Sequence, residues 1–403
     1  MADGQLSPPT PPTPPTPRTE DDRLDRLRLV RSRRVGAVTF HRLMAEHGSA
    51  RAALAALPGI ARAAGVEAYE ICPLGVVQAE VTQGRALAAR LLVHGEADYP
   101  QALADIPDAP PVLWAKGDVS LLNRPSVGMV GARNASSLGV RMARRLGLGL
   151  SDAGFTVISG LARGIDTAAH EAALEGQGRT IAVMAGGVDV IYPPENAALA
   201  AMIDANGCRI SEHPPGLDPQ ARHFPLRNRI IAGLSRAVIV VEAAVKSGSL
   251  ISARAALDYG RDVMAVPGHP FDARASGCNI LIRDGALLVR SPQDVLEALG
   301  APTESSPEPE MRLAPLPGPA APQRPLKEVA LLHSMILNRL GPSPLAEDQL
   351  MRDLNVTSAQ LAPELLVLEL DGRISRQPGG LLARVTEVGV HPDSPAPRFA
   401  TTG

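Results

Sequence analysis

The chain has 403 residues, more than the roughly 100 to 200 residues of a typical domain, so we expect two or three domains. It contains no run of about 18 apolar residues and begins with a stretch rich in Pro and Thr. We therefore expect neither a membrane span nor a secretory leader and place the protein in the cytoplasm. Three widely spaced cysteines argue against a disulfide framework and a metal site. With a net charge of −2, any nucleic-acid site must be a local patch of cations.

The first 92 residues are predicted to hold a tail and a small helical domain. Residues 1–19 are rich in Pro and Thr and predict a disordered tail, whereas residues 20–92 carry leucines and small residues at helical spacing. Within this domain Leu57-Pro58-Gly59-Ile60 predicts a sharp turn between two short helices, which resembles a helix-hairpin-helix. Such a turn offers backbone N–H groups to a phosphate, or serves only to fold the domain.

Residues 93–299 are predicted to form a Rossmann-like α/β domain. Short apolar runs alternate there with helical stretches, a pattern typical of a parallel sheet covered by helices. Ligands of such sheets bind beyond the carboxyl ends of the strands, and the unusual residues of this chain gather there. The predicted strands are 127–130, 156–158, 180–183, 209–210, 237–241 and 262–266.

The C-terminal part is predicted to be a winged helix. Residues 300–325 are a Pro-rich linker, residues 326–390 contain three expected helices (329–340, 346–355 and 357–370) and a β-hairpin, and residues 391–403 form a flexible tail. The third helix carries Glu364 and Glu369 and no Lys or Arg. Because phosphate repels acidic side chains, we expect a protein contact or a structural role here rather than base readout.

Four of the loops that follow strands carry glycines, hydroxyls and cations suited to phosphate. The first loop, which begins at Gly131, lacks the GxGxxG pattern and its downstream acidic residue, so we expect no dinucleotide and no other cofactor. Asp166, at the end of the second loop (residues 159–166), and His170, on the helix that follows it, are interpreted as structural. The candidate DNA-binding residues of these loops are Arg133, Ser159, Gly160, Gly164, Gly186, Gly187, Lys246, Ser247 and Ser249.

The loop at residues 222–229 combines an aromatic ring with cations. One of only five phenylalanines, Phe224, lies among Arg222, Arg227, Asn228 and Arg229. Proteins that bind single strands use an aromatic face for a base and cations for its phosphates. The alternative is that the ring packs in the core and the arginines are solvated. We interpret all five residues as DNA-binding.

Several ordered motifs together resemble the DNA processing protein A (DprA/Smf) family over roughly residues 95 to 295. The resemblance implies an extended Rossmann fold between a SAM-like helical domain and a winged helix. It also implies a homodimer that binds single-stranded DNA and loads the recombinase RecA in natural transformation, with a single-strand-binding protein as a further partner. The motifs are Tyr99-Pro100, Pro110-Pro111-Val112-Leu113-Trp114, the 159–166 loop, Tyr192-Pro193, Ser211-Glu212, Phe224-Pro225 with Arg227-Asn228-Arg229, Ser247-Gly248-Ser249 and Val266-Pro267-Gly268.

Carried over by position, Arg133 resembles the family's phosphate-binding arginine, and Ile282 and Leu288 fall on the apolar edge that resembles the dimer surface. The chain departs from the family where a lysine often follows the Tyr-Pro pair, because Pro194 stands there instead. This removes a phosphate contact, for which Arg222 is expected to compensate in part.

Two other functions fit the residues less well. One is a Rossmann-like nucleotide or sugar-phosphate hydrolase with Glu242 or Asp189 as the general base, but no catalytic motif accompanies these carboxylates. The other is an adaptor whose helical and winged-helix domains bind proteins while DNA affinity is incidental. We therefore expect a binding protein rather than an enzyme.

Overall fold

The computed structural model describes residues 19–66, 68–176, 179–302, 326–341, 345–370, 373–377 and 381–384. Most of the two predicted tails and of the linker therefore lies outside the described residues. Contacts within the chain define two compact units: Met1–Ala55 with Glu70–Leu316, and Ala56–Tyr69 with Pro317–Gly403. The first unit joins most of the N-terminal helical residues to the α/β core. No helix among the described residues is both long and apolar enough to cross a membrane.

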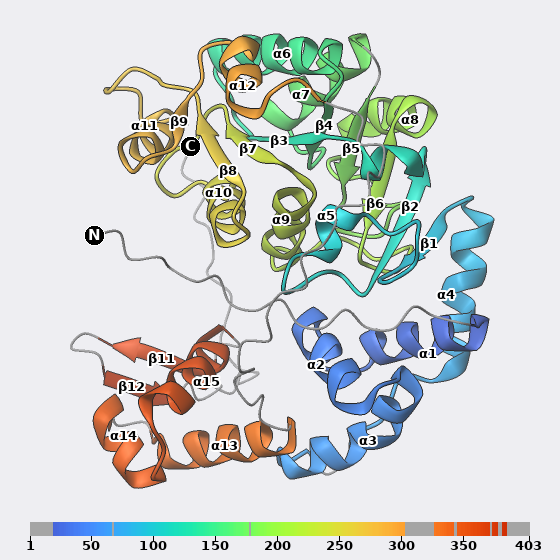
Figure 1. The fold of residues 1–403 in the computed structure, drawn as a ribbon, viewed down its shortest axis with the longest axis vertical. Coiled ribbons are helices and arrows are strands. Elements are labelled where there is room, and N and C mark those ends of the chain that lie inside the picture. Colours follow the sequence, from blue (N-terminus) through green and yellow to red (C-terminus); the bar gives the residue numbers. More distant parts are fainter. Residues whose placement is uncertain are drawn as a thin grey trace, which may run out of the picture. The chain divides into compact units, whose positions relative to one another are not determined.

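A nine-stranded sheet forms the core of the first unit, in the order β1-β2-β6-β5-β4-β3-β7-β8-β9 (Figure 1). Every pair from β6 to β9 along this order is parallel. The six strands predicted from the sequence are confirmed: β3 (Ser126–Val130), β4 (Thr156–Ser159), β5 (Thr180–Val183), β6 (Cys208–Ser211), β7 (Ala237–Val240) and β8 (Asp262–Ala265).

Three strands toward the two edges of the sheet were not predicted. β1 (Arg90–Val93) and β2 (Val112–Gly117) pair antiparallel with each other, and β2 pairs antiparallel with β6. β9 (Leu287–Leu288) is only two residues long and pairs with β8. The first four residues of β2 are all buried, so the strand lacks the alternation that would identify an antiparallel strand with one solvated face.

Alternate residues of the central strands enter two separate cores. Val127 and Met129 of β3 pack with α6 (Ser137–Asp152) and α12 (Pro292–Leu299), whereas Val130 packs on the opposite face with α9 (His223–Leu234). Helices therefore cover both faces, as Figure 1 shows. The remaining helices around the sheet are α5 (Gln101–Ala104), η1 (Val119–Asn123), α7 (Ile165–Glu175), η2 (Pro194–Asn196), α8 (Ala197–Asn206), α10 (Ser249–Asp258) and α11 (Ser276–Arg283).

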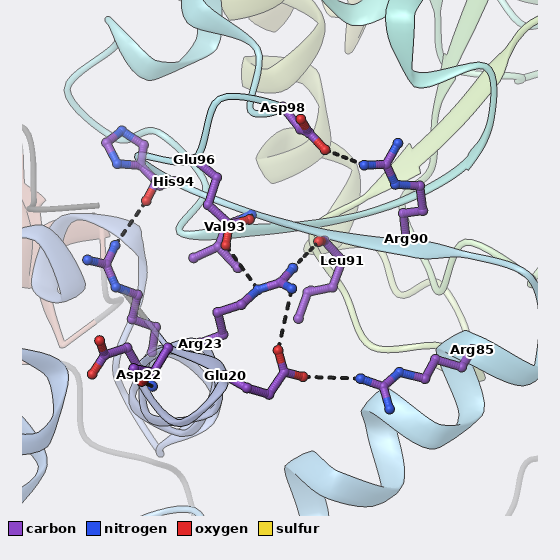
Figure 2. A network of polar contacts seen from close by, with 12 residues as sticks. Glu20, Asp22, Arg23, Arg85, Arg90, Leu91, Val93, His94, Glu96 and Asp98 are labelled. Carbon is purple, nitrogen blue, oxygen red and sulfur yellow. Dashed lines mark hydrogen bonds and ion pairs between the residues drawn. The ribbon is translucent and has the colours of Figure 1, made fainter. Parts of the chain in front are cut away.

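The N-terminal helix α1 (Glu20–Arg31) is tied to the edge strand β1 by guanidinium groups. Arg23 donates to the Leu91 carbonyl at 2.7 Å and forms an ion pair with Glu96 at 3.0 Å, and Arg26 donates to the His94 carbonyl at 2.9 Å (Figure 2). Because these bonds satisfy backbone carbonyls at and just beyond an exposed sheet edge, they fix the helix and cover that edge.

The predicted turn at residues 57–60 is wrong. A single helix, α3 (Ala50–Ala63), runs through these residues with Pro58 inside it. An internal proline costs roughly 3 kcal/mol, but the alanines and leucines on both sides are strong helix formers, and together they outweigh it. The other N-terminal helices are α2 (Ala37–His47) and α4 (Leu74–Ala86).

The second unit contains the predicted winged helix. Helices α13 (Leu326–Arg339), α14 (Glu347–Leu354) and α15 (Ser358–Leu370) precede the hairpin of β11 (Ile374–Gln377) and β12 (Leu381–Arg384), to which β10 (Leu345–Ala346) adds a third strand. On the acidic third helix, the Glu364 carboxylate lies 2.7 Å from His333, so it has a partner within its own unit.

Candidate nucleic-acid interface

A cleft of about 970 Å³ opens at the carboxyl ends of β3 and β7. Its walls come from the loop after β3, the start of α9, and the segment that joins β7 to α10. The position is the one expected for a ligand of a parallel α/β sheet. The lining includes Arg133, Asn134, Asp166, Tyr192, Phe224, Arg227, Asn228, Lys246, Ser247, Ser249, Ile251 and Arg274.

An aromatic pair and a guanidinium form one wall of the cleft. The Arg133 guanidinium lies 4.7 Å from the centre of the Phe224 ring, a cation–π contact. The Tyr192 ring lies 5.9 Å from the Phe224 ring and is 48% exposed. Sequence reasoning identified Tyr192 only as part of a motif, although its aromatic side chain beside a glycine-rich loop was a usable signal. Two rings and a cation here offer stacking faces beside a positive charge.

The Arg133 loop is held rigidly by its neighbours. The Ala132 N–H donates to the Glu242 backbone carbonyl at 2.7 Å, and the Glu242 carboxylate accepts the Ser136 N–H at 3.0 Å. At Gly164, φ is +77° and an added Cβ would overlap the Ala132 carbonyl oxygen, so only glycine allows the two loops to pack this closely. Gly164 therefore acts by positioning Arg133.

The two carboxylates considered as general bases have structural partners. Glu242 binds the Ser136 N–H and hydroxyl at the start of α6. The Asp189 carboxylate accepts the Gly216 N–H at 2.8 Å. Both carboxylates therefore fix loops in this structure.

Arg227 contributes a buried positive charge to the cleft. Its side chain donates to the Val183 carbonyl at 3.0 Å, and its Nε atom has no hydrogen-bond partner among the described residues. Burial lowers the pKa of Arg227, and the nearby Asp166 opposes that shift. The Asp166 carboxylate in turn accepts the Gly160 N–H at 3.1 Å, and burial raises its pKa. Gly160 lies against the Arg227 guanidinium, where a larger residue would collide.

The remaining wall combines hydroxyls, an amide and a lysine. Asn228 donates its amide to the Gly248 carbonyl at 3.2 Å, and the hydroxyls of Ser247 and Ser249 lie 2.6 Å apart. Lys246 is exposed beside them. Because α10 begins at Ser249, its N-terminal N–H groups add partial positive charge.

Four predicted DNA-binding residues are buried with other partners. The Ser159 hydroxyl donates to the Met129 carbonyl at 2.6 Å, and Arg229 pairs with Glu212 at 2.5 Å. Gly186 and Gly187 lie against the 214–219 segment, where an added Cβ would meet backbone atoms. None of the four lines the cleft, so their assignment to DNA contact stays a prediction.

Three further predicted residues lie outside the cleft lining. Arg222 is exposed next to α9, with its Nε 3.4 Å from His223, so the suggested compensation for Pro194 stays a prediction. Ile282 is half-buried against the core, and Leu288 is 39% exposed on β9. Their assignment to a dimer surface stays a prediction too.

His170 is predicted to make the stability of the protein dependent on pH. It is fully buried, its Nε2 accepts the Leu161 N–H at 3.3 Å, and its Nδ1 lies 2.7 Å from the Thr180 hydroxyl. Burial lowers the pKa of His170 to about 3, and Arg227 adds to this effect. Between pH 6.5 and 3 the unfolded state therefore binds the proton and the folded state does not. Lowering the pH from 7 to 5 should cost about 2 kcal/mol through this residue.

The measurement is urea unfolding at pH 7 and pH 5 for the wild type and His170→Gln. Other buried histidines contribute equally to both proteins, so the variant should lose about 2 kcal/mol less between the two pH values. Equal losses in the two proteins would show that His170 titrates normally.

Three family models match consecutive parts of the chain. The model described as DNA recombination-mediator protein A matches residues 90–300, the DprA-like N-terminal HHH domain matches residues 20–82, and the DprA winged helix domain matches residues 319–380. The central match contains all residues that line the cleft.

Curated relatives agree with these matches. Protein Smf of Synechocystis sp. is 38% identical over 313 residues, which are 72% of this chain and 79% of the relative. DNA processing protein DprA of Streptococcus pneumoniae is 49% identical over 198 residues, which are 49% of this chain and 70% of the relative. The X-ray structure of DprA from Streptococcus pneumoniae superposes with a TM-score of 0.51 at 41% identity, covering 59% of this chain and 86% of that one.

The fold and the cleft define a Rossmann-like protein with a cationic, aromatic site at the ends of its strands. The chain belongs to the DprA family of DNA processing proteins.

Proposed function

We propose that the chain binds single-stranded DNA in this cleft. One observation carries the proposal: the Arg133 guanidinium over the Phe224 ring, with Tyr192 beside it and Arg227 and Lys246 lining the same cleft. Rings stack on bases and cations bind phosphates, and this combination is the one that proteins use for single strands.

The same arrangement favours single strands over duplex. In a duplex the base faces are stacked on one another and cannot reach Phe224 or Tyr192, whereas a single strand presents them freely. Backbone contacts through Arg133, Lys246 and the serine hydroxyls carry no sequence information. Binding should therefore show little sequence preference.

The proposal extends to a homodimer that loads RecA recombinase onto incoming DNA in natural transformation. Membership of a family described as recombination mediators supports the extension. The exposed apolar pair Leu287 and Leu288 at the sheet edge supports self-association. The proposal assigns no catalytic role to any residue.

The test is fluorescence anisotropy of a labelled oligo-dT strand and of a duplex across a salt series, with wild type and Arg133→Ala. Wild type should prefer the single strand, and log K should fall with log salt by about 0.7 per phosphate contacted. Arg133→Ala should bind about 10- to 100-fold more weakly with a flatter slope, because one charge-assisted phosphate contact is lost. Equal binding to both forms, or none, would contradict the proposal.

Truncation after Pro325 separates DNA binding from recombinase loading. The truncated chain keeps every residue of the cleft, so its affinity for oligo-dT should match that of the full chain. If stimulation of RecA strand exchange were lost while DNA binding stayed intact, the winged helix would be the part that contacts a protein.

A further inference from the structure

The Phe271 side chain is almost fully exposed to solvent, which is unusual for an aromatic hydrocarbon ring. It is 94% exposed, and the next most exposed large hydrophobic side chain among the described residues, Leu138, is 66% exposed. The residue lies in the loop between β8 and α11. An exposed phenylalanine forgoes the free energy that burial of its ring would supply.

The loop that presents Phe271 is braced rather than loose. At its start, the Gly268 N–H donates to the Asn279 side chain at 3.1 Å, and the Asn279 amide donates to the Gly268 carbonyl at 3.0 Å. The Asp272 N–H donates to the His269 carbonyl at 2.9 Å, which closes the turn around Phe271. These hydrogen bonds fix the backbone of the loop and so keep the Phe271 ring in its exposed position.

The neighbours of Phe271 have the chemistry of a nucleic-acid contact. The His269 ring lies 5.5 Å from the Phe271 ring. Three residues after Phe271, Arg274 lines the cleft and pairs with Asp272 at 3.2 Å. Because β8 pairs with β7, this loop starts at the strand end next to the one that carries Lys246. Arg274 thus links the exposed ring to the cleft.

We propose that Phe271 is a second stacking platform, which receives a base of the same DNA strand where the strand leaves the cleft past Arg274. The inference rests on the proposed function and adds a contact outside the cleft. Phe271 lies three residues before Arg274, which lines the cleft, and single-strand binders repeat aromatic platforms along the strand. The polar neighbours Asp272 and Arg274 disfavour an apolar protein partner at this loop.

The first experiment measures affinity for a labelled oligo-dT of about 16 nucleotides by anisotropy. Phe271→Ala should weaken binding by about 5- to 50-fold, and Phe271→Tyr, which keeps the ring, should restore wild-type affinity. Leu257→Ala is the matched control, because Leu257 is 60% exposed on α10 and does not line the cleft. Its affinity should equal that of the wild type.

The second experiment reads the contact directly. The only tryptophan, Trp114, is 1% exposed and gives a constant background, so Phe271→Trp places a reporter at the loop. Stacking of a base should quench its emission as oligo-dT is added. Sedimentation without DNA measures the oligomeric state and tests the alternative that Phe271 contacts a second copy of this chain.

The outcomes separate the two claims. If wild type fails to bind oligo-dT, the proposed function itself is wrong. If wild type binds, but Phe271→Ala binds equally well and Phe271→Trp stays unquenched, only the second platform is overturned. A Phe271→Ala variant that loses self-association while keeping its DNA affinity would show that the ring contacts another copy instead.

Discussion

Replacing Arg229 with methionine is expected to lower the free energy of unfolding by about 3–5 kcal/mol. Arg229 is buried, lies 2.5 Å from the Glu212 carboxylate and donates to the Asp108 carbonyl at 2.8 Å. Removing the guanidinium leaves Glu212 buried without this cation and the Asp108 carbonyl without this donor. Urea unfolding at pH 7 measures the loss.

A double variant shows whether the charge is the cause. Glu212→Gln removes the carboxylate that Arg229 neutralises, so Arg229→Met combined with Glu212→Gln should be less destabilising than the sum of the two single changes. A loss below about 1 kcal/mol for Arg229→Met would contradict the structural role and return Arg229 to the candidate DNA contacts.

The largest expected effect on binding comes from changing Arg133 and Phe224 together. Each alanine substitution should weaken oligo-dT binding about 10- to 100-fold, because one removes a phosphate contact and the other a stacking face. The two side chains touch at 4.7 Å, so their effects should not be additive. A double-mutant cycle should give a coupling free energy of about 0.5–2 kcal/mol.

Leu226→Ala is the control for this cycle. Leu226 is 46% exposed on the same helix as Phe224 but does not line the cleft, so its loss should leave affinity unchanged. Strict additivity of the Arg133 and Phe224 changes would mean that the two residues contact DNA independently, or that only one of them does.

The sequence predicted the sheet and its loops well because both depend on local patterns. Short β-branched runs between helical stretches identified the six central strands, and glycines with hydroxyls after them identified the loops. The winged helix was predicted for the same reason, from helical periodicity and a hairpin turn. Pro58 shows the limit of local rules, since flanking helix formers overrode its usual effect.

The sequence alone could not show which arginines line the cleft and which form buried ion pairs. Arg227 and Arg229 are two residues apart in one motif, yet one lines the cleft and the other forms a buried ion pair with Glu212. That partner is 17 residues away, and the Asp108 carbonyl is 121 residues away. Burial of a charge depends on such distant partners. Phe271 was missed because one phenylalanine in a loop forms no pattern in the sequence.

The most direct test of the central claim is photo-crosslinking of an oligonucleotide that contains 5-iodo-deoxyuridine, with the attached peptides identified by mass spectrometry. Stacked aromatic residues react efficiently, so crosslinks are expected at Tyr192 and Phe224, the two rings that line the cleft. Phe224→Ala should remove one of them while leaving the other. Crosslinks confined to residues 326–384 would instead place the DNA on the winged helix and contradict the assignment of the cleft.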